Sequence, residues 1–182
     1  MPRQIDDRDR DLIDAARRAI EGQYRPGQTR TAREVGAALR TASGDVYTGV
    51  NLTTDTPRAS VCAEPVAIGA AVTDGEESFE TVVAVLYEPG DNPEYDGDPD
   101  AAPETRIISA CGVCRELIRD YDPDTDVILH GESCDSDDPV KVAVTDAVVS
   151  RQSASSTRPT LAGTVDAAGR CLLPEPLTGR SK

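Results

Sequence analysis

Lysine is scarce in this sequence, and the scarcity limits the partners that the protein can have. Only Lys141 and Lys182 are lysines, and the formal net charge of the 182 residues is −14. Proteins that bind nucleic acids gather lysine and arginine on one face to neutralise phosphates. The charge therefore argues against a nucleic-acid partner. It favours a halophilic source with high internal salt, where a Debye length of about 3 Å at 1 M makes the repulsion tolerable; an ordinary acidic protein is the alternative.

Histidine and long apolar runs are lacking as well. His130 is the only histidine, and we expect it to be structural, which argues against hydrolases of the Ser–His and Cys–His types. The longest apolar runs, such as residues 82–87, are strand-sized and too short to cross a bilayer. Residues 1–4 lead straight into charged residues and carry no secretory signature. We expect a soluble, cytoplasmic protein with no membrane partner.

The hydrophobic pattern predicts one α/β domain over residues 1–150, followed by a loosely packed tail, rich in serine, threonine and proline, over residues 151–182. Hydrophobic residues make up 38% of the chain, which is enough for one core. The periodicities predict the order α-β-β-α-β-α-β, typical of a layered α/β domain. The predicted helices cover 6–23, 61–72 and 111–121, the predicted hairpin covers 34–41 and 46–50, and strands follow at 79–86, 127–130 and 140–149, the last with a helical turn.

Two acidic segments interrupt this pattern. Residues 89–106 contain many carboxylates among prolines and glycines, and we predict a solvated loop insertion there. Residues 132–138 are predicted to form a second acidic loop. A calcium site in the first segment is the alternative, but the ordered ligand spacing of a calcium loop is missing.

The chemistry of the chain is concentrated in Cys62-Ala63-Glu64 and Cys111-Gly112-Val113-Cys114. If the second segment opens a helix, its two cysteines lie on one face with Cβ atoms roughly 5–6 Å apart, close enough to share an ion. Three thiolates with one open position make a zinc site that can hold and activate a water molecule. Glu64, two residues beyond the first ligand, is placed beside the metal as a proton shuttle.

Each piece has a plainer explanation when it is taken alone. Cys111 and Cys114 could be a redox pair or half of a structural metal site. Cys62 could be a buried helix cysteine. Cys134 and Cys171 are most simply free thiols. The combination of the two segments is what favours a catalytic zinc centre.

The chain resembles the cytidine deaminases, including the blasticidin-S deaminase branch, over roughly residues 10–150. Residues 35–39 and 44–51 are similar to the first hairpin of the family. Residues 62–64 are similar to its first zinc motif and residues 109–115 to its second, in the form with three cysteines. The resemblance implies a three-layer α/β/α sandwich with a central mixed sheet. It also implies a homo-oligomer, a tetramer or a dimer.

The resemblance implies roles for individual residues. Zinc would activate a water molecule to attack the amine-bearing carbon of a cytosine-like ring, and Glu64 would carry the proton to the ring nitrogen. The carbonyl group of Ser109 would accept a hydrogen bond from the leaving amine, and Ala63 would contribute to substrate binding. Asn51 would hold a sugar hydroxyl; a turn residue after a strand is the equal alternative.

Several positions depart from the family pattern. Ala110 stands in place of a proline, Thr53 in place of a ribose-binding glutamate, and Arg33 near a phenylalanine that packs beside the ligand. Pro65 replaces an arginine that offsets thiolate charge in family members with three cysteines. We predict that Arg115 takes over part of this charge-tuning role; a surface salt bridge is the alternative.

Three interpretations follow from these residues. The first is a hydrolytic deaminase of cytidine, deoxycytidine or a cytosine-nucleoside analogue. The second is a deaminase of another or modified base, of the blasticidin-S type, which the departures at Thr53 and Arg33 keep open. The third is a non-catalytic module that zinc only stabilises. The buried carboxylate of Glu64 argues against the third, because a purely structural site has no use for it.

Overall fold

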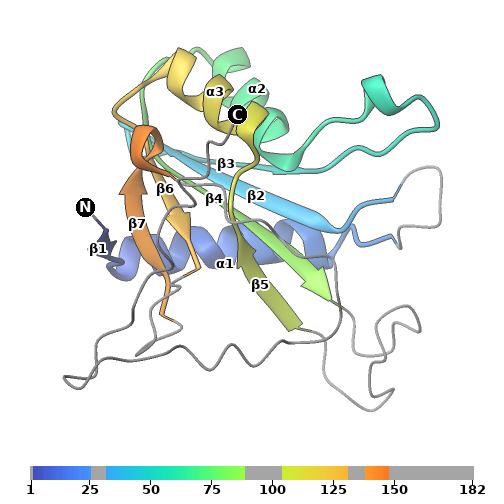
Figure 1. Ribbon diagram of the computed structural model, residues 1–182, viewed down its shortest axis with the longest axis horizontal. Coiled ribbons are helices and arrows are strands. Elements are labelled where there is room, and N and C mark those ends of the chain that lie inside the picture. Colours follow the sequence, from blue (N-terminus) through green and yellow to red (C-terminus); the bar gives the residue numbers. More distant parts are fainter. Residues whose placement is uncertain (1, 26–31, 89–103, 131–137, 148–182) are drawn as a thin grey trace, which may run out of the picture.

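The computed structural model describes residues 2–25, 32–88, 104–130 and 138–147. Within these ranges, a sheet of seven strands lies between helices (Figure 1). The elements in chain order are β1 Arg3–Gln4, α1 Asp7–Glu21, β2 Val35–Thr41, β3 Val46–Val50, η1 Pro57–Ala59, α2 Ala63–Thr73, β4 Phe79–Glu88, β5 Glu104–Ile108, α3 Gly112–Tyr121, β6 Asp126–Leu129, β7 Val140–Ala143 and η2 Val144–Asp146, where η denotes a 3-10 helix.

The sheet is mixed and has the strand order β1-β7-β6-β4-β2-β3. The central strand β4 pairs antiparallel with β2 along one edge. Its other edge is shared, because residues 81–82 pair parallel with β6 and residues 84–88 pair antiparallel with β5. Helix α1 covers one face of the sheet, and α2 and α3 cover the other (Figure 1). The predicted three-layer α/β/α sandwich with a mixed sheet is confirmed.

Helix α1 starts at a capping box and packs closely against β2. The side chain of Asp6 accepts a hydrogen bond from the main chain of Asp9, and the side chain of Asp9 accepts one from Asp6. A Cβ atom on Gly36 would lie 2.4 Å from the carbonyl oxygen of Ala16, so only glycine permits this approach. The buried apolar side chains of the helix are Leu12, Ile13, Ala16 and Ile20.

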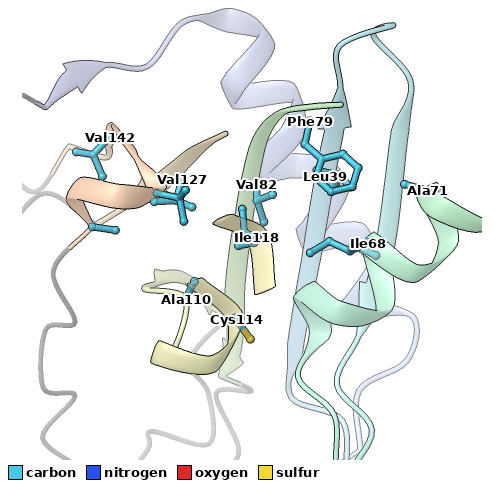
Figure 2. Close-up of a cluster of buried hydrophobic side chains, with 13 residues drawn as sticks. Leu39, Ile68, Ala71, Phe79, Val82, Ala110, Cys114, Ile118, Val127 and Val142 are labelled. Atoms are coloured by element: carbon cyan, nitrogen blue, oxygen red, sulfur yellow. The ribbon is translucent and has the colours of Figure 1, made fainter. Parts of the chain in front are cut away.

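The core on the opposite face joins α2 and α3 to the sheet (Figure 2). Ile68 of α2 and Ile118 of α3 are buried in the same cluster as Val82 of β4. Helix α2 also lies very close to β3, because a Cβ atom on Gly49 would stand 2.6 Å from the carbonyl oxygen of Ala63. The start of α2, where the first cysteine motif lies, is therefore set directly by the β2–β3 hairpin.

The predicted acidic loop insertion over residues 89–106 is wrong at its C-terminal end. Residues 104–106, assigned to the acidic insertion, belong to β5, where residues 104–108 pair with residues 84–88 of β4. The strand escaped notice because it begins with three charged or polar residues and ends with only two isoleucines, so its pattern shows no alternation of apolar and polar residues. Strand β1 and helix η1 were not predicted at all. Residues 89–103 of the first acidic loop, residues 132–137 of the second and the predicted tail lie outside the described residues.

Within the described part of the chain, no helix combines the length and the apolar character that a membrane crossing requires. The cytoplasmic location stays a prediction.

Candidate active site

Three cysteine sulfurs meet where α2 and α3 begin. Cys62 is the N-cap residue of α2, Cys111 is the N-cap residue of α3, and Cys114 lies in the first turn of α3. The Sγ atom of Cys111 lies 4.0 Å from that of Cys62 and 3.5 Å from that of Cys114. All three sulfur atoms lie within 4.8 Å of one another. The structure thus brings together the three cysteines that the sequence analysis predicted as metal ligands.

The spacing of these sulfurs fits one zinc ion. A tetrahedral zinc with Zn–S bonds of about 2.3 Å holds its sulfur ligands about 3.8 Å apart. Among the described residues, no fourth histidine, cysteine or carboxylate joins the cluster, so these residues leave one tetrahedral corner open. Burial raises the pKa of the Cys62 and Cys114 thiols in the metal-free chain. A divalent cation supplies the charge that favours their thiolate forms.

The two helix N-termini add positive potential at the sulfurs. Helices carry a partial positive charge at their N-terminal ends, where main-chain N–H groups are unpaired. The N–H group of Cys114 donates to the Sγ atom of Cys111 at 3.5 Å. Arg115 lies one residue farther along α3, and its guanidinium group donates to the carbonyl oxygen of Ala147, at the end of η2. The charge-tuning role of Arg115 stays a prediction.

Glu64 is a buried acid beside the sulfur cluster. It occupies the first turn of α2, and only 4% of its surface is exposed. Burial raises the pKa of its carboxyl group, and a hydrogen bond with the side chain of Cys114 lowers it by less. A carboxyl group whose pKa is shifted toward neutrality is suited to accept and return a proton.

A pocket of about 310 Å³ opens beside the cysteines and Glu64. Asn51, Ala63 and Ser109, which the family resemblance implied as substrate-binding residues, all line it. The residues of the wall that sequence reasoning missed are Val35, Leu52, Ser60, Val61 and Ile108.

A signal in the sequence could have found one of these missed residues. Val35 is two residues before the buried Ala37, so both side chains lie on the same face of β2. Leu52 and Val61 offered no such signal, because they meet through an isolated β-bridge between residues nine positions apart.

The side chain of Asn51 is already engaged in holding the hairpin. Its Oδ1 atom accepts hydrogen bonds from the N–H groups of Glu34 and Val35 at 2.8 and 2.9 Å. Its Nδ2 atom donates to the Oγ1 atom of Thr53 at 3.2 Å, and Thr53 also lines the pocket. The Nδ2 atom also donates to the carbonyl oxygen of Ala32 at 3.4 Å, so both ends of the amide group hold the local backbone. Its contact with a sugar stays a prediction.

Arg33 and His130 lie elsewhere. Arg33, expected near the ligand, is not among the residues that line the pocket and instead pairs with Arg25 through two main-chain hydrogen bonds of 2.8 and 2.9 Å. His130 directly follows β6 and is exposed.

Comparisons with known proteins agree with this geometry. The family described as the cytidine and deoxycytidylate deaminase zinc-binding region matches residues 8–130. The chain is 37% identical to the blasticidin-S deaminase of Bacillus cereus over 126 residues, which cover 69% of this chain and 81% of the relative. It is 30% identical to the cytidine deaminase of Sporosarcina psychrophila over 110 residues, or 60% and 67% of the two chains.

Solved structures show the same fold. The crystal structure of the cytidine deaminase from Burkholderia pseudomallei superposes with a TM-score of 0.53 at 25% identity, covering 75% of this chain and 93% of that one. The family match spans both cysteine motifs and Glu64. The chain therefore belongs to the cytidine and deoxycytidylate deaminase family and is a zinc-dependent hydrolytic deaminase.

Proposed function

We propose that the protein removes the amino group from the cytosine ring of a free nucleoside or nucleoside analogue and releases ammonia. The observation that carries this proposal is the convergence of three sulfurs and a buried carboxyl group at one pocket. The pocket volume of about 310 Å³ is at the lower end of the range of small-molecule sites. A nucleoside fits such a volume.

The residues of the chain divide the work of this reaction. Zinc, when bound, supplies Lewis-acid chemistry that makes water a nucleophile near neutral pH. Glu64 takes a proton from the water, delivers it to the ring nitrogen, and helps ammonia to leave. Ala63 and the carbonyl group of Ser109 hold the ring and its amine, while Asn51 donates its amide N–H to a sugar hydroxyl.

The charge of the pocket wall favours a nucleoside over a nucleotide. None of the described residues that line the pocket is lysine or arginine. A phosphate group there would find no counter-charge among these residues. We therefore expect deoxycytidine 5′-phosphate to be a poor substrate.

A second candidate is an antibiotic nucleoside of the blasticidin-S type. It is favoured by the 37% identity to a blasticidin-S deaminase over 81% of that protein. Thr53 supports it as well, because this neutral side chain on the pocket wall takes the place of the ribose-binding glutamate of cytidine deaminases. We expect Thr53→Glu to raise kcat/KM for cytidine relative to blasticidin S, since a carboxylate accepts hydrogen bonds from sugar hydroxyls.

One set of assays tests these proposals. Zinc is counted per chain, and ammonia release is measured with cytidine, deoxycytidine, deoxycytidine 5′-phosphate and blasticidin S, at low and high salt. We expect at least one nucleoside to turn over and the phosphate to react far more slowly. Faster reaction of blasticidin S than of cytidine selects the second candidate. A zinc-loaded protein that turns over none of these compounds would contradict the proposed function.

Two variants separate chemistry from metal binding. Glu64→Gln should keep zinc and lose about 10²–10⁴-fold in kcat, the usual contribution of a positioned acid–base group. Cys111→Ser should lose both zinc and activity. Persistent turnover by the Glu64 variant would show that another group moves the proton.

We also propose that Arg115 offsets part of the thiolate charge and that the protein is a homo-oligomer. Arg115→Gln should weaken zinc retention or shift the pH–rate profile, and an unchanged enzyme on both counts would refute the proposal about Arg115.

Leu52 and Val61 support the proposal that the protein is a homo-oligomer, because these pocket-lining apolar residues are 45% and 37% exposed. Light scattering should report a dimer or tetramer, and a monomer would refute it.

A further inference from the structure

We propose that Cys111 and Cys114 form a reversible thiol switch, in which a small-molecule disulfide oxidises the pair to a Cys111–Cys114 disulfide and the metal is released. The inference rests on the zinc centre and not on the identity of the nucleoside. It involves two of the sulfurs proposed to bind zinc, here in thiol–disulfide exchange.

The distances favour this pair of sulfurs over the pairs that include Cys62. The Sγ atoms of Cys111 and Cys114 are 3.5 Å apart within one helical turn, so side-chain rotation can close most of the gap to a bond of about 2.0 Å. The sulfur of Cys62 is 4.0 Å from that of Cys111 and belongs to a different helix. A bond from Cys62 would have to draw α2 and α3 together, and α2 is held in place by its close packing on Gly49.

The two cysteines differ in exposure, and this difference assigns each a role in the exchange. Cys111 is exposed and Cys114 is fully buried. A small disulfide can therefore reach the sulfur of Cys111 but not that of Cys114. Cys111 is thus the attacking group, and Cys114 is the group that resolves the mixed disulfide.

The exchange takes place in two balanced steps. The thiolate of Cys111 attacks one sulfur of oxidised glutathione, forms a mixed disulfide and expels one glutathione thiolate. The thiolate of Cys114 then attacks the Cys111 sulfur of this mixed disulfide and expels the second glutathione thiolate. The cysteine pair loses two electrons and the glutathione disulfide gains two. Because the metal-bound cysteines enter as thiolates, the chain releases a zinc ion instead of protons.

Loss of the metal follows from the ligand count. A disulfide removes two of the three sulfurs in the cluster, and Cys62 alone offers one ligand. One ligand does not hold a zinc ion against dilution. A dithiol reductant reverses both exchange steps and restores the site, so activity becomes a function of the thiol–disulfide balance.

The test uses the zinc-loaded protein with Cys134→Ser and Cys171→Ser, so that the three cluster sulfurs are its only thiols. Oxidised glutathione is added in steps. Zinc release is followed with a chromophoric chelator, free thiols are counted, and the disulfide is located by peptide mass mapping. We expect one zinc released, two thiols lost and one Cys111–Cys114 disulfide formed per chain, all reversed by dithiothreitol and added zinc.

Two further variants check the order of events by mass rather than by activity. Cys114→Ser should stop at a glutathione adduct on Cys111, because the resolving thiol is gone. Cys62→Ser should still form the Cys111–Cys114 disulfide. The proposal is overturned if the bond formed includes Cys62, if zinc leaves without a disulfide, or if all three thiols survive a large excess of oxidised glutathione.

Discussion

Replacing Arg40 with methionine tests how much of the fold depends on one buried guanidinium group. Arg40 is the last residue but one of β2, and its side chain, which contacts α1, is only 4% exposed. It donates to the carboxylate of Asp9 at 2.8 Å, to Glu80 at 3.0 and 3.1 Å, and to the carbonyl oxygen of Arg8 at 2.8 Å. These bonds connect α1 to β2 and β4, on the face of the sheet opposite to the candidate site.

The expected loss follows from what the substitution leaves behind. Removing one partner of a buried ion pair costs about 3–5 kcal/mol, because the other charge stays buried without compensation. Here Asp9 keeps the ammonium group of Lys141 at 2.8 Å, and Glu80 keeps Arg8 at 3.1 Å. Both carboxylates thus retain a counter-charge, and we expect the lower end, about 3 kcal/mol of unfolding free energy.

Arg8→Met is the matched control, because Arg8 also pairs with Glu80 but its side chain is 59% exposed. Exposed ion pairs contribute less than about 1 kcal/mol and weaken in salt. Urea unfolding of both variants at low salt and in 1 M salt measures the two losses. A loss from Arg40→Met that is no larger than that from Arg8→Met, or that disappears in salt, would refute the reasoning.

Three further predictions concern pH, packing and the metal. Burial raises the pKa of Asp9, but hydrogen bonds from Lys141 and Arg40 outweigh it and hold the pKa below its ordinary value. The stability that Asp9 contributes is therefore present above the pKa of an unfolded aspartate, about 4, and is lost as the pH falls through the lowered pKa. The difference in unfolding free energy between the native protein and Asp9→Asn should shrink in acid, and a constant difference would contradict this. Gly49→Ala should lower the free energy of unfolding by about 1–3 kcal/mol and reduce kcat/KM. Gly69→Ala is the control: nothing lies near its Cβ position, and it should stabilise the helix by about 0.5–1 kcal/mol. Equal effects of the two substitutions would argue against the close contact at Gly49. Chelating zinc should lower Tm, since an ion at 100 times its Kd stabilises the native state by about 2.7 kcal/mol, and an unchanged Tm would show that the metal does not couple to folding.

The three sulfurs and Glu64 could be predicted from the sequence because the chemistry that joins them is local. Cys111 and Cys114 are three residues apart on a helix, a spacing that fixes their distance whatever the rest of the fold does. Glu64 follows Cys62 by only two residues at the start of α2, so these two residues are also close along the chain. The only long-range requirement is that α2 and α3 begin side by side, and the family resemblance supplied it.

The pocket wall and β5 could not be predicted in this way, because long-range pairing creates them. Leu52 and Val61 come together through a bridge across η1, and no periodicity signals it. Strand β5 exists because β4 is longer than the part that β6 covers, so residues 84–88 have backbone groups free to pair. The strand propensity of a segment that begins Glu104-Thr105-Arg106 is weak, so it is pairing with β4 that makes this segment a strand.

The placement of helix α2 rests on glycine contacts that a sequence pattern does not explain. Nothing in the strand pattern of residues 46–50 calls for a glycine, and Gly49 by itself weakens the strand. The structure supplies the reason, since at Gly49 the backbone of α2 lies closer to β3 than any Cβ atom permits, while at Gly36 the backbone of α1 does the same to β2 from the other face. The β2–β3 hairpin is therefore held from both faces, and α2 cannot withdraw from it without losing this contact. Because Cys62 and Glu64 stand at the start of α2, the hairpin determines the position of the first sulfur and of the carboxyl group relative to the two sulfurs of α3.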